Sequence, residues 1–213
     1  MRKPRIAVDA DNVLLDYSTA YAWAWKRAFG WHPIERDPTA YWPMDRWGVE
    51  RLTGEALDRF RACFDTQFWS TIQAVPGAIQ GCNDLHEAGF ELACVSALEP
   101  QHEAARLKNL RALGFPIERV VATGADASVA NPKAAALAEL DPVAFVDDFL
   151  PYLRGLRSSI HTALIVRQCT GTPNVGPDLE SLGSQHDDLC AFSAWWLAQS
   201  PNTQLGLDPS TRS

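Results

Sequence analysis

The chain has 213 residues, 46% of them hydrophobic, which is enough for one core and a small added unit but not for a third domain. A formal charge of −7 and a pI near 5.2 give no general attraction for a nucleic-acid polymer, although a metal ion and local cations can still receive a small phosphorylated substrate. No apolar run is long enough for a signal peptide or a membrane span, and the five cysteines have no ligand-like spacing, so we expect a cytoplasmic protein with reduced thiols and no membrane partner.

The first predicted element is a buried strand over residues 5–8, which stops at two acids one residue apart, Asp9 and Asp11. Open parallel sheets bind their ligands at this end of a strand. Two carboxylates this close repel each other unless one is protonated or a cation lies between them. Two uses of this carboxylate pair stay open: one acid could be a nucleophile and the other an acid/base, or both could be ligands of a hard divalent ion. Such a pair, taken alone, is equally compatible with a polar strand end in solvent.

The next segment, residues 15–75, is much longer than a strand crossover requires. Helical patterning over Tyr17–Phe29 and over 53–64, with Thr53 as a possible N-cap, predicts a small helical cap above the acidic site. Most of its tryptophans are expected to pack the core of the cap, and some to face the cleft. They are Trp23, Trp25, Trp31, Trp42, Trp47 and Trp69.

The rest of the chain alternates strands and helices, which predicts a parallel sheet covered on both faces. We expect, in order, a helix from near Pro76, a strand at 91–95, a helix at 100–113 ended by Gly114, a strand at 119–121, a helix at 132–140 with Asn131 as its N-cap, and strands at 143–146 and 162–166. The predicted domains are a core, 1–14 and 76–200, the cap, 15–75, and a frayed tail, 201–213.

Three later element ends carry residues that suit phosphoryl transfer. Ser96 can donate a hydrogen bond to a phosphoryl oxygen, and Lys133 can neutralise charge during an attack by Asp9. Asp147 and Asp148 can complete a magnesium shell. Each of these residues also has an ordinary structural explanation. Ser96 could simply end a strand, Lys133 could be a solvated helix residue, and Asp147 and Asp148 could cap a turn. The ordered set favours the catalytic interpretation.

Together these segments resemble the four motifs of the haloacid dehalogenase-like hydrolase superfamily, over roughly residues 5–150. They are Asp9-Ala10-Asp11-Asn12-Val13, Ser96, Lys133 and Asp147-Asp148, and Val75-Pro76-Gly77-Ala78 is similar to the family's return to the core. The resemblance implies an α/β fold, a Rossmann-like parallel sheet flanked by helices with a cap inserted after the first strand. It also implies a phosphatase that uses Mg²⁺.

By this resemblance Asp9 is the nucleophile that forms an aspartyl-phosphate, and Asp11 is the general acid/base. Asp9, the backbone carbonyl of Asp11, and Asp148 would bind the metal, with Asp147 beside them or sharing the role. True dehalogenases lack the second acid of the first motif, so Asp11 favours phosphate chemistry. Asn12 stands where glycine is commoner, which restricts the loop without removing a catalytic group.

Within the superfamily, the segment from Asp9 to Tyr17 is similar to the opening of the 5'(3')-deoxyribonucleotidase branch, in which an aromatic at the place of Tyr17 stacks on the base. The segment 192–196, with two tryptophans, is similar to the closing helix of that branch. We expect Trp42 and Trp47 to extend the stacking wall. Ala97 follows Ser96 where the branch usually has a second hydroxyl, so one contact with phosphate or sugar is expected to be missing.

The expected function is therefore a magnesium-dependent phosphomonoesterase acting on a small phosphorylated metabolite, with a (deoxy)nucleoside monophosphate as the candidate substrate. A sugar-phosphate phosphatase and a phosphotransferase or mutase of the same superfamily are the alternatives. A binding module that has lost catalysis is a weaker alternative, because all of the motif residues are retained.

Overall fold

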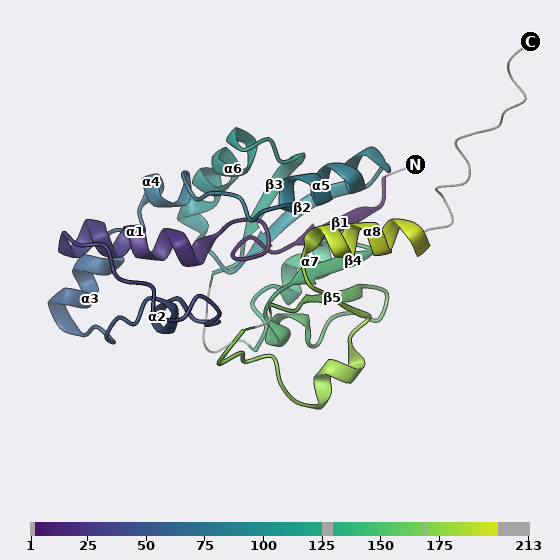
Figure 1. The fold of residues 1–213 in the computed structure, drawn as a ribbon. Coiled ribbons are helices and arrows are strands. Elements are labelled where there is room, and N and C mark those ends of the chain that lie inside the picture. Colours follow the sequence, from purple (N-terminus) through teal and green to yellow (C-terminus); the bar gives the residue numbers. More distant parts are fainter. Residues whose placement is uncertain (1–2, 125–129, 168, 200–213) are drawn as a thin grey trace, which may run out of the picture.

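The sheet has six parallel strands in the order β3-β2-β1-β4-β5-β6 (Figure 1). The computed structural model describes residues 3–124, 130–167 and 169–199, so the predicted tail lies outside the described residues. The strands are β1 (Arg5–Val8), β2 (Glu91–Ser96), β3 (Ile117–Ala122), β4 (Ala144–Asp147), β5 (His161–Ile165) and β6 (Ser184–His186). The chain runs from β1 outward to β3 and then returns to β4, so the strand order reverses between β1 and β4. Sheets of this type bind ligands at such a reversal.

Helices cover both faces of the sheet, as the alternation of elements predicted. Alternate residues of β1 point to opposite faces, and all four are buried. Ile6 and Val8 belong to a core packed under α5 (Ala78–Glu87), α6 (Glu103–Ala112) and α8 (Leu189–Gln199), whereas Ala7 belongs to a second core under α7 (Ala134–Leu140). Burial on both faces explains why these strands are continuous apolar runs.

Four helices lie between β1 and α5 and gather beyond one end of the sheet (Figure 1). They are α1 (Tyr17–Phe29), α2 (Pro43–Arg46), α3 (Gly54–Arg61) and α4 (Thr66–Trp69). We call residues 15–75 the inserted unit. Its two ends run side by side, since Asp16 N–H donates to Gln73 O at 2.8 Å and Val75 N–H donates to Leu14 O at 2.9 Å. The unit therefore leaves and re-enters the core at one place.

The inserted unit packs around aromatic side chains that are continuous with the core on the Ile6 and Val8 face of the sheet. Trp25 and Tyr21 of α1 contact Phe60 of α3, with ring centroids 5.4 and 5.0 Å apart. Of the six tryptophans in the unit, Trp25, Trp47 and Trp69 are buried, and Trp23, Trp31 and Trp42 are exposed. Aromatic side chains of this size supply the burial that a small helical unit requires.

One local prediction needs correction, and three short elements were not predicted. Helix α7 begins at Ala134, and its N-cap position is Lys133 and not Asn131. Asn131 instead ties the preceding loop to the core, because its Nδ2 donates to Tyr152 O at 2.7 Å and its Oδ1 accepts from Lys133 N–H at 3.0 Å. Thr53 is at the N-cap position of α3, as predicted, although its side chain makes no capping hydrogen bond. The strand β6 and the one-turn helices α2 and α4 are too short for hydrophobic periodicity to predict them.

Within the described residues, no helix combines the length and apolar character that a membrane span needs. All five cysteines are free thiols; Cys63, Cys82 and Cys94 are buried, and the other two are half-buried. Burial raises the pKa of the Cys82 thiol, so this group is neutral at physiological pH.

Candidate active site

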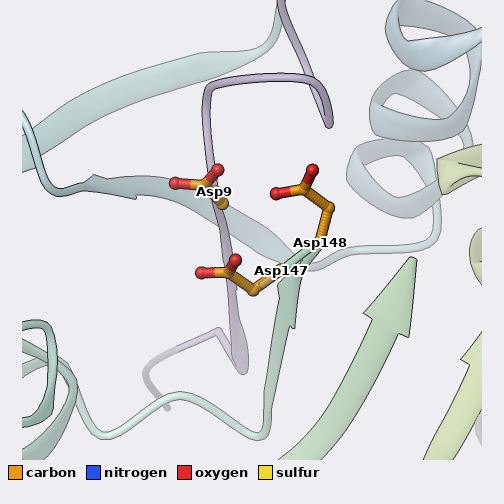
Figure 2. Close-up of side chains that lie close together, drawn as sticks. All are labelled: Asp9, Asp147 and Asp148. Carbon is orange, nitrogen blue, oxygen red and sulfur yellow. The ribbon is translucent and has the colours of Figure 1, made fainter. Parts of the chain in front are cut away.

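Three carboxylates meet at the reversal of the strand order. Asp9 follows β1, and Asp147 ends β4; Figure 2 shows both side chains and that of Asp148 directed into the same space. The strand register places them together, because Val8 pairs with Val146. One oxygen of each carboxylate lies within 4.8 Å of the others, and all three residues are buried. A cluster of carboxylate oxygens at this spacing is a ligand set for a hard divalent cation.

Lys133 joins two of these carboxylates. Its Nζ donates to Asp9 Oδ1 and, at 2.7 Å, to Asp147 Oδ2, and its side chain is almost completely buried. Burial opposes the charge of the ammonium, but the carboxylates of Asp147 and Asp9 outweigh this effect and raise the pKa of Lys133. The lysine is therefore a permanent cation beside the predicted nucleophile.

Asp148 is held from three directions. Arg167 Nη1 lies 3.1 Å from its Oδ2, and its backbone carbonyl accepts bonds from Tyr41 OH at 3.2 Å and Asn174 Nδ2 at 2.7 Å. Burial raises the pKa of Asp148 to about 7, and the nearby charge of Asp9 adds to this. Burial likewise raises the pKa of Asp147 well above its ordinary value. A further cation is required to keep all the acids ionised at neutral pH.

Asp11 lies apart from the cluster and faces an arginine. Arg106, on α6, is completely buried, and its Nη2 lies 2.7 Å from Asp11 Oδ1. The ring of Trp69 covers the guanidinium group, 4.9 Å from its carbon. Desolvation raises the pKa of Asp11, and the charge of Arg106 opposes the rise.

The loop that carries Asp11 turns sharply at Asn12. Its φ of 61° is in the left-handed region, which asparagine adopts more readily than most residues. Asn12 Oδ1 also accepts from Ser18 Oγ at 3.0 Å, which ties the loop to the first turn of α1. This dual role explains how asparagine replaces the commoner glycine.

Ser96 ends β2, the neighbour of β1, and so lies at the same edge of the sheet. Its side chain is buried, and within the described residues its Oγ has no hydrogen-bond partner. A buried hydroxyl without a partner is costly, so this group is suited to an anion that enters the site.

A cavity of about 300 Å³ opens above the acids. Asp9, Asp11 and both acids of the pair line its floor, and Ala97 lies at its edge. Its walls are mostly aromatic, formed by Tyr17, Tyr41, Trp42, Phe149 and Tyr152. Trp42 comes from the inserted unit and Phe149 from the loop after β4, with ring centroids 6.3 Å apart at 70°. The wall therefore spans both parts of the molecule.

The structure brings most of the predicted site residues together. The acids, Lys133, Tyr17, Trp42 and Ala97 are at this cavity or in direct contact with its floor. Ser96 is buried and does not line the cavity, and Trp47 does not lie there either. This side chain is buried under α1, and its Nε1 donates to Ser18 O at 2.7 Å. A buried indole N–H needs such an acceptor, so Trp47 packs the inserted unit and does not extend the stacking wall.

Sequence reasoning missed five residues of the site, namely Tyr41, Arg106, Phe149, Tyr152 and Arg167. Phe149 directly follows the acid pair and Tyr152 comes three residues later, so their place in the sequence could have indicated that they lie near the site. Arg106 carried no such signal, because it lies far along the chain from Asp11, whereas Arg167 directly follows the strand predicted at 162–166 and so could have been placed at the same edge of the sheet.

No protein-family model matches the sequence, and a search of curated proteins also finds no match. Solved structures do match. A haloacid dehalogenase-like hydrolase from Streptococcus pneumoniae has a TM-score of 0.61 and 14% sequence identity, with 91% of this chain and 98% of that chain covered. An HAD family hydrolase from Deinococcus radiodurans, solved with bound phosphate and sodium, has a TM-score of 0.59 and 15% identity, covering 92% and 96%.

An L-2-haloacid dehalogenase from Xanthobacter autotrophicus, with chloropropionic acid covalently bound, has a TM-score of 0.56 and 13% identity, covering 93% and 100%. Likeness at these identities shows the fold. The chain has the Rossmann-like α/β fold of the haloacid dehalogenase-like hydrolases, as its motifs predicted.

Proposed function

We propose that this protein is a magnesium-dependent phosphomonoesterase that works through an aspartyl-phosphate on Asp9. The observation that carries the proposal is the position of the Asp9 carboxylate, which accepts a hydrogen bond from Lys133 and shares a buried cluster with Asp147 and Asp148. The bound phosphate in the Deinococcus hydrolase of the same fold supports a phosphorylated ligand.

The residues present fit a magnesium ion. The cluster of Asp9, Asp147 and Asp148 offers only oxygen ligands, which Mg²⁺ prefers, and the backbone carbonyl of Asp11 is the further ligand implied by the family resemblance. When bound, magnesium neutralises negative charge on the phosphoryl oxygens and on the carboxylates.

The charges of the site support a need for the metal. Four carboxylates face three cations, Lys133, Arg106 and Arg167, and each cation is already paired with an acid. With all four carboxylates ionised, one negative charge remains, so a phosphate dianion would be repelled without additional positive charge.

The chain's own residues supply the chemistry in two steps. A carboxylate oxygen of Asp9 attacks phosphorus, the bond to the leaving oxygen breaks, and Asp11 gives that oxygen a proton. Asp11 then takes a proton from water, which attacks phosphorus and releases phosphate and free Asp9. Lys133 and the Ser96 hydroxyl stabilise charge on the phosphoryl oxygens.

Asp11 separates this proposal from dehalogenase chemistry. Displacement of a halide needs no proton on the leaving group, whereas an alkoxide needs one. Asp11 lines the same cavity as Asp9, which supports its role as this proton donor.

For the substrate we propose a phosphate monoester with a flat leaving group, such as a nucleoside monophosphate. The aromatic walls can stack on a base, and base stacking contributes about 1 to 3 kcal/mol per base. A sugar phosphate would leave these rings without a flat partner.

The test is a panel of phosphate monoesters, assayed with magnesium and with a chelator, with 2-chloropropionate as a dehalogenase control. We expect phosphate release that requires magnesium and no chloride release. Chloride release from 2-chloropropionate without turnover of any phosphate ester would overturn the proposal.

A further inference from the structure

The pair formed by Arg106 and Asp11 is not explained by the proposed chemistry alone. Arg106 is completely buried, yet Asp11 is its single carboxylate partner, and within the described residues its Nε and Nη1 make no hydrogen bond. Burying an arginine with a single carboxylate as its partner has a large desolvation cost in free energy, and a buried ion pair of this kind often gives no net stability. Packing alone therefore does not explain why an arginine is buried at this position.

The geometry of the pair restricts Asp11. The 2.7 Å bond from Arg106 Nη2 engages Oδ1, although the Asp11 side chain is still 31% exposed. Without this bond the carboxyl group could turn away from the cavity into solvent. Because Oδ1 is engaged, Oδ2 is the oxygen left to exchange a proton with a bound molecule.

Arg106 is itself locked in place. It rises from α6 in the core, and the Trp69 ring at the end of the inserted unit lies over its guanidinium. Trp69 in turn stacks on Tyr17, a wall residue of the cavity, with ring centroids 6.1 Å apart and planes 12° apart. The orientation of Asp11 thus depends on packed groups from both the core and the inserted unit.

We propose that Arg106 is a positioning residue that fixes the Asp11 carboxyl group for proton transfer to the leaving group. This inference rests on the proposed function, because it assigns Asp11 the role of general acid. Arg106 touches neither the cavity nor the reacting atoms, so it acts only through Asp11.

Two variants and a matched control test the inference. Arg106→Met removes the donor and retains the bulk, whereas Arg106→Lys retains a cation on a flexible stem. The control is Asn109→Leu, one turn further along α6, because Asn109 is equally buried but bonds to Ile72 O at 2.9 Å and does not contact Asp11.

The readout is kcat for an alkyl phosphate, whose leaving group needs a proton, and for p-nitrophenyl phosphate, whose leaving group does not. We expect Arg106→Met to lower kcat for the alkyl ester by about 10²-fold, the cost of a small misplacement, and for the nitrophenyl ester by much less. Arg106→Lys should restore part of the loss, and Asn109→Leu should leave the ratio of the two rates unchanged. Equal losses on both esters in Arg106→Met would show a merely structural role.

A second measurement does not depend on activity. A double-mutant cycle of Arg106→Met with Asp11→Asn, read as the free energy of unfolding in urea, should show strong non-additivity. Additive effects would overturn the inference even if the enzyme is active. If the wild type hydrolyses neither ester, the proposed function fails, whereas the cycle still reports whether the pair is coupled.

Discussion

The backbone amide of Asp9 donates a 2.8 Å hydrogen bond to the carbonyl of Val146. This bond continues the β1–β4 ladder one residue past β1 and sets the Asp9 side chain beside that of Asp147. Because the bond uses only backbone atoms, it holds whatever side chain residue 9 carries. The position of the proposed nucleophile is therefore a property of the sheet.

This arrangement predicts that Asp9→Asn retains the fold and loses turnover by more than about 10⁴-fold, because an amide cannot act as the anionic nucleophile. Circular dichroism should show unchanged secondary structure. Phosphate release comparable to that of the wild type would exclude the covalent mechanism.

Asp11→Asn should retain the fold and lose rate according to the leaving group. General acid/base help is worth about 10²- to 10⁴-fold, so an alkyl phosphate should lose this much while p-nitrophenyl phosphate loses less. The ratio of kcat values for the two esters is the measurement. If both rates fell equally, Asp11 would not be the proton donor.

Magnesium should stabilise the protein more at pH 8 than at pH 6. The pKa of Asp148 is about 7 in the metal-free fold, above its ordinary value of 3.8, so the stability that its protonated form supplies is lost as the pH rises through 7. Metal binds the ionised carboxylate, and at pH 6 it must first displace a proton, which weakens binding about tenfold.

The measurement is the increase in Tm on adding magnesium at each pH. Asp148→Asn should abolish most of the increase, whereas Asp141→Asn, a change at an exposed aspartate outside the site, should not. An increase that does not vary with pH would argue against Asp148 as a ligand.

Trp42→Ala should lower kcat/KM for nucleoside monophosphates by roughly 5- to 150-fold and leave acetyl phosphate, which has no ring to stack, nearly unaffected. Trp42 is suited to this test because it is 45% exposed and lines the cavity, whereas Tyr17 is packed against Trp69 and other rings. Trp31→Ala, at an equally exposed tryptophan outside the cavity, is the matched control. An equal loss on every substrate would make Trp42 a packing residue.

Within the inserted unit, Asp65 should contribute a small pH-dependent stability. Its bond from Arg27 Nη2, at 2.6 Å, is the main reason that its pKa falls to about 2. Because the pKa is lowered, the stabilisation is present above about pH 4 and is lost as the pH falls toward 2. The pair is largely exposed, so we expect only about 0.2 to 1 kcal/mol.

Asp65→Asn is the suitable variant, because asparagine retains the N-cap of α4 and removes only the charge. Its difference from the wild type in free energy of unfolding should be measurable at pH 7 and vanish near pH 2. A difference of the same size at both pH values would assign the effect to capping.

Local sequence patterns were sufficient to predict five of the six strands of the sheet. Apolar runs that stop at Asp9, Ser96 and Asp147 mark the ends of buried parallel strands, and the carboxyl ends of such strands meet at one edge. Helix α1 was predicted with its observed bounds from its helical patterning alone, and the structure shows that it ends at Gly30 in the left-handed conformation. These features depend on residues close together in the chain.

Long-range packing decided the rest of the site. Nothing near Arg106 in the sequence indicates that it faces Asp11, because that contact forms only when α6 packs against the loop after β1. Arg167 does follow a predicted strand, but its pairing with Asp148 depends on β5 lying beside β4. Long-range packing also decides which aromatic residues are buried. Trp42 lines the cavity and Trp47 is buried, although they are only five positions apart in the sequence. Composition determines that a small unit requires large apolar side chains, but only the packing of that unit against the core determines which of them remain free to meet a substrate.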